Sequence, residues 1–349
     1  MKILVTGGAG YLGSVLIPKL LARRHQVRVL DVGYFGVGHL RSLRPAVDLI
    51  REDIRTVCAD MKFCANLVED LDCIIHLAAI SNDPSAELYP DLTAEVNIHA
   101  TRTLAEMAQS KNIRFIFSSS CSVYGETDSE ITESGPLNPL TIYAKSKMES
   151  EQLLENLANE RWAPLILRNG TLFGYSPRMR FDLVANIFSL YSSLYNEIKV
   201  FGEGGEWRPF LHVDDCARAI VFFAEKSRPH YRCYNIAHEN LRVIDLANIF
   251  KHINPALIVT HISTSNQDSR NYRVSTQRMQ KEGFCTRISL EAGAEEMTES
   301  IISGLIQDPE SIYYRNVKWL NELTRIGEKN HKEIVTLMES VAYLHGLGK

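Results

Sequence analysis

The sequence predicts an α/β protein with a doubly wound parallel β-sheet, because two observations about its first half agree. Short, nearly continuous apolar segments alternate with longer amphipathic segments, as expected for strands that are buried on both faces and covered by helices. A glycine cluster joins the first strand to the first helix. The predicted strands are Lys2–Val5, Gln26–Asp31, Asp48–Arg51, Asp72–Leu77, Ile113–Ser118 and Pro164–Arg168. The predicted helices are Tyr11–Arg23, Asp91–Ser110 and Thr141–Glu160.

The composition excludes several classes of protein. A formal net charge of −4 disfavours a general nucleic-acid binder, which needs a basic surface. No apolar run approaches the roughly 20 residues that span a bilayer, and the N-terminus lacks the features of a signal peptide. The 7 cysteines are scattered without a CxxC pair, so no metal site is expected. We therefore expect a cytoplasmic protein that binds neither nucleic acid nor a membrane.

The segment Thr6–Gly13 (TGGAGYLG) has the features of a dinucleotide-binding turn. It follows a predicted strand and opens a predicted helix, which is the setting that such a turn needs. Gly7 would permit the tight turn, Gly10 would let the backbone approach a pyrophosphate, and Gly13 would allow close packing of helix on strand. The pyrophosphate would then bind amide groups at the helix N-terminus. A glycine-rich turn with a purely structural role would show the same spacing.

Two acidic residues follow predicted strands near this turn. Asp31 ends the second strand at the distance expected for the acid that accepts a hydrogen bond from the adenosine ribose 2′-hydroxyl. A carboxylate at that position would repel a 2′-phosphate, so the sequence favours NAD over NADP. Asp53 follows the third strand and could meet the adenine amino group. The alternative for Asp31 is a capping or turn residue without a ligand.

The alternation of strands and helices loosens after Arg168, which predicts a second, smaller domain. We expect residues 1–168 and about 209–237 to form the NAD-binding domain. Residues 169–208 and 238–305 would form the substrate domain at the carboxyl ends of the strands, where open α/β sheets bind ligands. Residues 306–349 are predicted to be a helical extension, with Ile334, Leu337, Val341 and Leu344 at helical spacing. This extension could pack on its own subunit or contribute to an expected homodimer.

A tyrosine and a lysine four residues apart, Tyr143 and Lys147, would share one face of the helix predicted at 141–160. Ser120 lies at the end of the strand before that helix. Oxidation of an alcohol requires removal of its proton while hydride leaves for a nicotinamide. A tyrosine base would need its pKa lowered from about 10 by up to about 3, and we expect Lys147 and the positive nicotinamide to lower it. Ser120 would bind the substrate oxygen.

The chain resembles the NAD-dependent epimerase/dehydratase family of extended short-chain dehydrogenases/reductases over about Lys2–Ser303. The matching motifs are TGGAGYLGS (Thr6–Ser14), DIR (Asp53–Arg55), HLAA (His76–Ala79), VN (Val96-Asn97), SSSCSVYG (Ser118–Gly125), YAKSK (Tyr143–Lys147) and RPFLHVDD (Arg208–Asp215). The resemblance implies a Rossmann-type fold and catalytic roles for Ser120, Tyr143 and Lys147. The NAD site that it implies consists of Gly7, Gly10, Tyr11, Leu12, Gly13, Asp31, Asp53, Ile54, Leu77, Ala78, Ala79, Asn97, Ser118, Tyr143 and Lys147.

The residues after Ser120 bear on the reaction. Sugar-nucleotide 4,6-dehydratases of the family carry an Asp-Glu pair there and UDP-glucuronate decarboxylases carry a Glu, whereas this chain has Cys121 and Ser122. Without a local carboxylate, removal of a proton from a neighbouring carbon has no base in this segment. The Ser-Cys-Ser sequence is closer to the Ser-Ala-Thr of UDP-galactose 4-epimerase. The Asn that this epimerase places three residues after the strand-ending Arg is Thr171 in this chain, so galactose specificity does not follow.

The expected function is NAD-dependent oxidation at one hexose carbon, C4, of a nucleotide-diphosphate sugar. We expect an epimerase, which would re-reduce the transient 4-keto sugar; the alternative is a 4-dehydrogenase, which would release it. A 4,6-dehydratase and a non-catalytic NAD-binding protein are less favoured alternatives. The segments Phe173–Asp182 and Arg270–Ser275 resemble a branch that includes bacterial GDP-heptose 4-dehydrogenases and proteins assigned as epimerases.

The smaller domain should supply cations for the substrate diphosphate, because guanidinium groups bind phosphates bidentately. The candidates are Arg208 and Arg270 first, and Arg178, Arg180 and Asn186 next. Ser81 and Asn82 follow the fourth strand and are expected to touch the sugar together with Ser120. The alternative for the arginines is an ordinary place on the surface.

Overall fold

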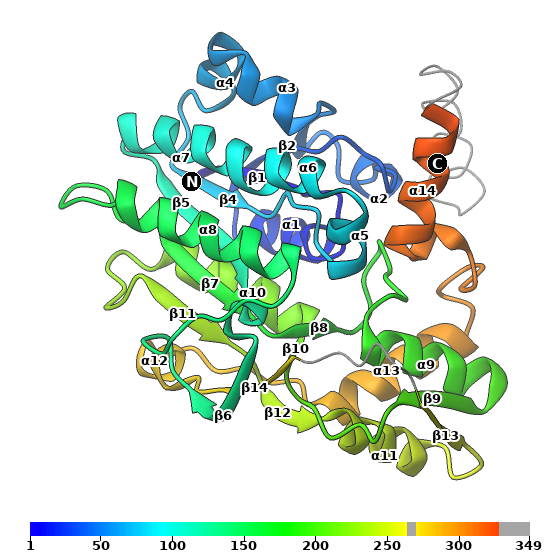
Figure 1. Ribbon diagram of the computed structural model, residues 1–349. Helices are drawn as coiled ribbons and strands as arrows, with labels where there is room; N and C mark the ends of the chain where they lie inside the picture. Colours follow the sequence, from blue (N-terminus) through cyan, green and yellow to red (C-terminus); the bar gives the residue numbers. More distant parts are fainter. Residues whose placement is uncertain (264–269, 328–349) are drawn as a thin grey trace.

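A seven-stranded, all-parallel β-sheet forms the centre of the computed structural model, which describes residues 1–263 and 270–327 (Figure 1). Its strand order is β11-β7-β5-β4-β1-β2-β3, and the order reverses between β1 and β4, as in doubly wound folds. The strands are β1 (Lys2–Thr6), β2 (Gln26–Leu30), β3 (Val47–Ile50), β4 (Cys73–His76), β5 (Arg114–Ser120), β7 (Leu165–Asn169) and β11 (Cys233–Ile236). The predicted fold class and the six predicted strands are therefore confirmed.

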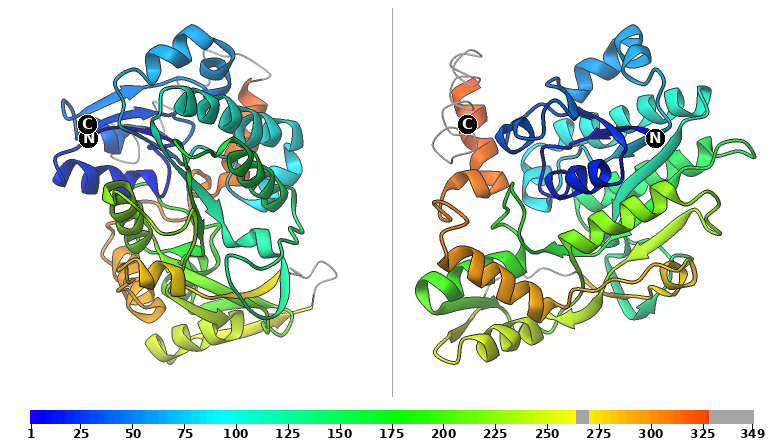
Figure 2. Two further views of the ribbon diagram at one scale, coloured as in Figure 1. Left: turned by 90° about the vertical axis from the view of Figure 1, so that its left-hand side faces the viewer. Right: turned by 180° about the vertical axis from the view of Figure 1, so that it is seen from behind.

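Successive residues of β1 pack on opposite faces of this sheet. Ile3 and Val5 belong to one apolar core with α1 (Gly13–Ala22) and α10 (Val213–Glu225). Leu4 belongs to a second core with α7 (Ala100–Ser110) and α8 (Ile142–Leu157). Figure 1 shows α7 and α8 on the near face of the sheet, and the left view of Figure 2 shows α1 on the other side. Both faces are covered, as the continuous apolar strands predict.

The helix that carries the Tyr-Lys pair has a well-defined start. The Oγ1 of Thr141 caps α8 by accepting a hydrogen bond from the amide of Ala144 (3.1 Å). The predicted helix at 91–110 consists of α6 (Pro90–Thr93), a π-helical turn η1 (Ala94–His99) and α7, which follow one another directly. The short helices around the sheet are α2 (Gly38–Arg41), α3 (Ile54–Ala59), α4 (Met61–Leu67), α5 (Asp83–Leu88), η2 (Cys121–Tyr124) and α12 (Gln277–Lys281).

Three small sheets lie beyond the carboxyl ends of the parallel strands (Figure 1). Their strands are β8 (Thr171–Phe173), β10 (Trp207–His212) and β12 (Glu239–Arg242) in one sheet, β9 (Glu197–Phe201) and β13 (Ile258–Ile262) in another, and β6 (Glu126–Ile131) and β14 (Asn271–Val274) in the third. The helices beside them are α9 (Val184–Tyr195), α11 (Val243–Ile253) and α13 (Leu290–Ile302). Phe188, Leu246, Phe250 and Leu290 form the centre of a separate apolar core in this region. The chain therefore packs as two regions. One is the parallel sheet with its helices, and the other is a smaller region made of these small sheets and helices at the carboxyl ends of the parallel strands.

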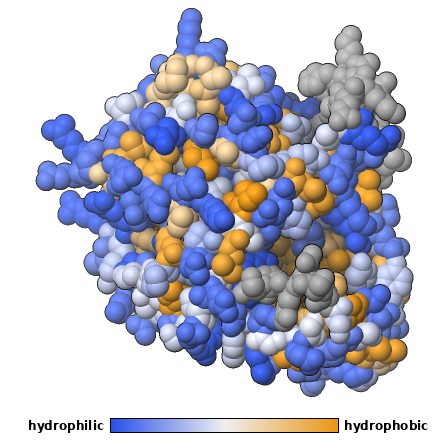
Figure 3. All heavy atoms as spheres, in the orientation of Figure 1, coloured by the Kyte–Doolittle hydropathy of each residue, from blue (hydrophilic) through white to orange (hydrophobic). Residues whose placement is uncertain are grey.

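The described part of the C-terminal extension packs on its own chain. It contains the single turn η3 (Ile312–Tyr314) and α14 (Asn316–Gly327), which lies beside α2 in Figure 1. The predicted apolar positions Ile334, Leu337, Val341 and Leu344 lie outside the described residues. Hydrophilic side chains predominate on the face shown in Figure 3, and the apolar ones are scattered. Within residues 1–263 and 270–327, none of the helices combines the length and apolar character needed to span a bilayer.

A buried ion pair joins α8 to the strands beneath it. The Nη2 of Arg168, on β7, lies 2.6 Å from Oε2 of Glu151, on α8, and their side chains are 4% and 1% exposed. The hydroxyl of Ser119, on β5, also donates to Glu151. Arg168 donates a further hydrogen bond to Tyr124 Oη (2.8 Å). This network fixes α8 against the carboxyl ends of β5 and β7.

We predict that Arg168→Met lowers the free energy of unfolding by about 3–5 kcal/mol, because the Glu151 carboxylate would stay buried without its cation. Chemical denaturation measures the change. Arg242→Ala is the control, since Arg242 pairs with Asp245 at the surface (Nη2–Oδ1, 2.7 Å) and its loss should leave the unfolding midpoint unchanged. Equal midpoints for Arg168→Met and wild type would show that the pair does not stabilise the fold.

Candidate active site

One cavity of about 880 Å³ runs along the carboxyl ends of the central strands and reaches into the smaller region. Most of the residues predicted to bind cofactor or substrate line it. They are Gly7, Gly10, Tyr11, Leu12, Gly13, Asp31, Asp53, Ile54, Leu77, Ala78, Ala79, Ser81, Asn82, Ser118, Ser120, Tyr143, Lys147, Arg178, Arg180, Arg208 and Arg270. Asn97 and Asn186 do not line it.

The glycines of the first turn are required by the space around them. Gly7 has φ +71°, and a Cβ on it would lie 2.7 Å from the amide nitrogen of Ala78. A Cβ on Gly13 would lie 2.5 Å from the carbonyl oxygen of Gly8, where α1 approaches the turn. Among the described residues, no side chain caps the N-terminus of α1, so the amide groups at this helix end are available to a ligand. The turn therefore fits the pyrophosphate of a dinucleotide.

The carboxylate of Asp31 is held beneath the glycine turn. Its Oδ2 accepts a hydrogen bond from the amide of Ala9 (2.9 Å), and its Oδ1 accepts one from Gly33 (2.8 Å). Burial raises the pKa of this carboxyl, while the two amides and the nearby Arg178 and Arg51 lower it. A carboxylate fixed at the end of β2 in this way can accept hydrogen bonds from a ribose.

Asp53 has a structural role in addition to its place in the cavity. Its Oδ1 caps α3 by accepting a hydrogen bond from the amide of Arg55 (2.9 Å). Its Oδ2 also forms an ion pair with the Arg55 guanidinium (2.7 Å). The adjacent Ile54 supplies apolar lining.

Asn97 supports the cofactor side of the cavity from behind. Its Oδ1 accepts a hydrogen bond from the amide of Ile80 (2.8 Å), and its Nδ2 donates to the carbonyl of Ile80 (3.1 Å) and to Ser146 Oγ (2.9 Å). These bonds fix the loop after β4, which carries the cavity-lining residues Ala78 and Ala79. The π-helical turn presents Asn97 to this loop rather than to the cavity.

Ser120, Tyr143 and Lys147 meet at one end of the cavity. Tyr143 and Lys147 come from the first turns of α8, and Ser120 ends β5. Ser120 lies close enough to Tyr143 to lower the pKa of the phenol. The ammonium of Lys147 donates to the carbonyl of Ser118 (2.8 Å) and lies 5.9 Å from the centroid of the Tyr143 ring. The three residues predicted to be catalytic are thus adjacent.

The expected lowering of the tyrosine pKa does not occur in the protein alone. Burial and, to a smaller extent, the negative charge of Asp83 raise the pKa of Tyr143 to about 12, even though Ser120, Arg180 and Arg270 lower it. Burial also lowers the pKa of Lys147 to about 7. The desolvation of the phenol therefore outweighs the cations that the chain places around it.

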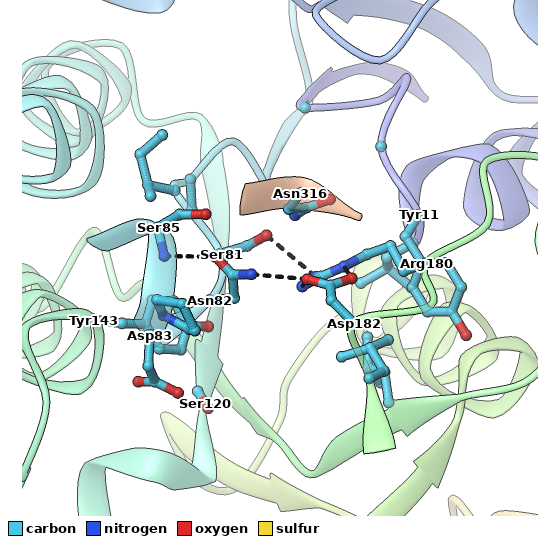
Figure 4. A pocket seen from close by; sticks show the side chains of 18 of the residues that line it. Tyr11, Ser81, Asn82, Asp83, Ser85, Ser120, Tyr143, Arg180, Asp182 and Asn316 are labelled. Atoms are coloured by element: carbon cyan, nitrogen blue, oxygen red, sulfur yellow. Dashed lines mark hydrogen bonds and ion pairs between the residues drawn. The ribbon is translucent and has the colours of Figure 1, made fainter. Parts of the chain in front are cut away.

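Two of the cavity carboxylates that were not predicted from the sequence, Asp182 and Asp83, form ion pairs with arginines. Asp182 binds Arg180 through both oxygens (Nη2–Oδ2, 2.7 Å; Nε–Oδ1, 3.0 Å) and accepts a hydrogen bond from Asn82 Nδ2 (2.7 Å) (Figure 4). Arg180 also donates to Ser81 Oγ (3.3 Å). Figure 4 shows this cluster across the cavity from Ser120. The only sequence signal for Asp182 was its place two residues after Arg180.

Asp83 is the second of these two carboxylates. Its Oδ2 accepts a hydrogen bond from Arg270 Nη1 (2.6 Å), and its Oδ1 accepts one from Thr141 Oγ1 (2.5 Å). Arg270 comes from the smaller region, as does Arg208, which donates to the carbonyls of Trp207 (2.9 Å) and Arg270. The two arginines that we expected to bind a diphosphate therefore lie together on the far wall of the cavity.

We expected Arg178 and Asn186 to bind a diphosphate in the smaller region, but both lie in other places. The Arg178 guanidinium stacks on Phe35, 3.8 Å from the ring centroid, on the side of the cavity near Asp31. Asn186 is fully buried and donates hydrogen bonds to Tyr11 Oη (3.1 Å) and to the carbonyl of Arg180 (2.9 Å). Asn186 thus positions Tyr11 and Arg180 from behind.

Comparisons with known proteins identify the family of the chain. Residues 3–237 match the NAD dependent epimerase/dehydratase family. The uncharacterized UDP-glucose epimerase YtcB of Bacillus subtilis (strain 168) is 34% identical over 245 residues, covering 66% of this chain and 74% of the relative. UDP-glucuronic acid decarboxylase 1 of Arabidopsis thaliana is 26% identical over 326 residues, covering 89% and 72%.

A solved structure shares the fold of most of the chain. The UDP-glucuronic acid 4-epimerase from Bacillus cereus, in complex with UDP-glucuronic acid and NAD, superposes with a TM-score of 0.76 at 26% identity. The match covers 87% of this chain and 99% of that structure. With its glycine turn, Asp31 and the Ser120–Tyr143–Lys147 group in place, the chain belongs to the NAD-dependent epimerase/dehydratase family of enzymes.

Proposed function

We propose that this enzyme oxidises one hexose carbon, C4, of a nucleotide-diphosphate sugar and re-reduces the keto sugar in place, as a 4-epimerase. The observation that carries the proposal is the meeting of Ser120, Tyr143 and Lys147 at a segment without an acid–base pair. Relatives named as UDP-glucose epimerase and UDP-glucuronic acid 4-epimerase support the substrate class.

The substrate would span the two walls of the cavity. Arg208 and Arg270 offer guanidinium groups for the diphosphate on the side of the smaller region. Ser81 and Asn82 stand next to Arg180 and are placed to contact the sugar near Tyr143. The sugar would then lie between the diphosphate site and the catalytic tyrosine.

Tyr143 would accept the proton of the sugar hydroxyl, and Ser120 would hold the hydroxyl oxygen. Bound NAD would supply the hydride acceptor and a positive charge beside the phenol. That charge matters because a tyrosine with a pKa of about 12 is almost entirely protonated at neutral pH. A hydrogen bond to the carbonyl of Ser118 holds Lys147 beside the Tyr143 ring, where its protonated form would add positive charge.

The residues after Ser120 give no acid or base for loss of water or carbon dioxide. The thiol of Cys121 is buried, donates to the carbonyl of Arg168 (3.2 Å), and has a pKa raised well above its usual range by burial. The Ser122 hydroxyl is buried and has no hydrogen-bond partner among the described residues. Two of the carboxylates that line the cavity, Asp83 and Asp182, each form an ion pair with an arginine. This arrangement supports hydride chemistry at a single carbon.

We expect Tyr143→Phe to retain NAD binding but to lose at least about 100-fold in turnover, because the phenyl ring cannot accept a proton. Turnover of a nucleotide sugar and NAD affinity by calorimetry check the two parts. Tyr272→Phe removes a hydroxyl from another tyrosine of the cavity wall and should change turnover far less. A Tyr143→Phe enzyme with wild-type turnover would refute the assignment of the base.

The Asp31 carboxylate should set the choice of cofactor, because it would accept the ribose hydroxyl and repel a 2′-phosphate. Wild type should bind NAD at least about tenfold tighter than NADP, a difference of about 1.4 kcal/mol. Asp31→Asn should narrow that ratio, and Asp53→Asn, at the adenine side, should not. Calorimetric titration with both cofactors measures the ratios. Equal affinities of wild type for NAD and NADP would show that Asp31 does not face the ribose.

The product should keep the carbon skeleton and the water content of the substrate. Because the Cys121–Ser122 segment offers no acid–base pair, we expect an epimer of unchanged mass from incubation with NAD and a panel of nucleotide hexoses. Mass spectrometry and chromatography of the products decide the outcome. A ketone two hydrogens lighter, with stoichiometric NADH, would identify a 4-dehydrogenase instead. Loss of water or carbon dioxide would contradict the proposed reaction class.

A further inference from the structure

The C-terminal segment Ile306–Gly327 (the C-terminal wall) lies beyond the part of the chain that matches the family, which ends at residue 237. It nevertheless borders the cavity. Asn316, Val317 and Leu320, all at the start of α14, are cavity-lining residues. Figure 4 shows Asn316 at the edge of the cavity, above Ser81 and Arg180.

The C-terminal wall is attached to the loop that follows Asp31. The indole Nε1 of Trp319 donates a hydrogen bond to the carbonyl of Tyr34 (2.5 Å), and the Trp319 side chain is buried. Tyr34 and Phe35 line the same cavity three and four residues after Asp31. The part of the cavity that the wall borders is therefore the adenosine half of the dinucleotide site.

A buried arginine connects the C-terminal wall to this half. Arg178 is 1% exposed, stacks on Phe35 and donates from Nη2 to Oδ1 of Asn316 (2.5 Å). Arg178 lies near enough to Asp31 to lower the pKa of that carboxyl. Burial lowers the pKa of Arg178 itself to about 10, so it remains a cation at neutral pH. Asn316 thus holds a positive charge beside the expected position of the adenosine ribose and phosphates.

The C-terminal wall is also attached to the segment around Phe181 and to the residue between α5 and α6. The carbonyl of Tyr314 accepts a hydrogen bond from the amide of Phe181 (2.8 Å), next to Arg180. Tyr89, in the region of α5 and α6, donates to Asn321 Oδ1 (2.7 Å). Figures 1 and 2 show α14 standing at the edge of the molecule beside the N-terminal region and above the smaller one. The wall therefore bridges both regions that enclose the cavity.

We infer that Ile306–Gly327 forms part of the NAD site, closing its adenosine half and slowing release of the dinucleotide. Such retention suits the proposed epimerase, in which the reduced cofactor has to stay bound until it returns the hydride. The inference rests on the NAD site of the proposed function but not on the identity of the sugar. The C-terminal wall would thus contribute to NAD binding from outside residues 3–237, the part of the chain that matches the family.

Val317→Glu tests this inference, because it places a carboxylate against a ligand with two negative phosphates. We expect NAD to bind at least tenfold more weakly, and to dissociate faster, as measured by calorimetry and stopped-flow displacement without any sugar nucleotide. Lys318→Glu is the matched control, since Lys318 is the next residue of α14, is exposed, and undergoes a larger change of charge. The control should stay within about twofold of wild type.

Asn316→Ala provides a second test if Val317→Glu fails to fold. It removes the acceptor of Arg178 without adding charge, and we expect several-fold weaker NAD binding with an apo-protein unfolding midpoint within a few degrees of wild type. Wild-type NAD affinity and release rate in a folded Val317→Glu protein, or in Asn316→Ala, would overturn the inference. Failure of the proposed function is distinguishable, because it would appear as missing product while NAD binding is intact.

Discussion

The buried ion pair between Arg168 and Glu151 is the interaction on which the geometry of the site depends. Glu151 lies one helical turn after Lys147 on α8, and Arg168 lies on β7 next to the strand that ends in Ser120. Ser119 donates to the same carboxylate, so the strand end and the helix share one anchor. A movement of α8 relative to β5 and β7 would separate the pair and leave a buried charge without its partner. Because such a charge strongly destabilises the fold, the position of the helix is fixed. The distance between tyrosine, lysine and serine is fixed in this way.

A second constraint comes from the turn before α9. Arg178 and Arg180 flank the buried Met179 and extend toward different parts of one cavity. Arg178 reaches the cofactor side, where Phe35 and Asn316 hold it. Arg180 reaches the catalytic side, where Asp182 neutralises it. One short segment of the smaller region therefore connects the cofactor half of the cavity with the half that faces Tyr143.

Much of this arrangement could be predicted from local sequence patterns. Apolar segments indicate the strands, and the glycine turn and the Tyr143–Lys147 spacing require only a neighbouring strand or helix to be interpreted. Asn97 and Asn186 form hydrogen bonds with backbone groups of Ile80 and Arg180 and do not line the cavity. The sequence could not indicate these roles, because only tertiary packing brings the partners together. The roles of Asp83 and Asp182 depend on arginines that the fold places beside them. Burial raises the pKa of Tyr143, and the spacing of residues in a motif gives no information about how deeply a side chain is buried.

In the proposed epimerase reaction, hydride leaves one carbon of the sugar and returns to the same carbon. A nucleotide hexose deuterated at C4 tests it most directly, with nuclear magnetic resonance and mass spectrometry of the product formed in ordinary water. The arrangement of Ser120, Tyr143 and Lys147 predicts an epimer that retains its deuterium at C4, because the label moves to the bound cofactor and back without exchange. Loss of the deuterium from C4, or incorporation of a solvent proton at a neighbouring carbon, would contradict the account.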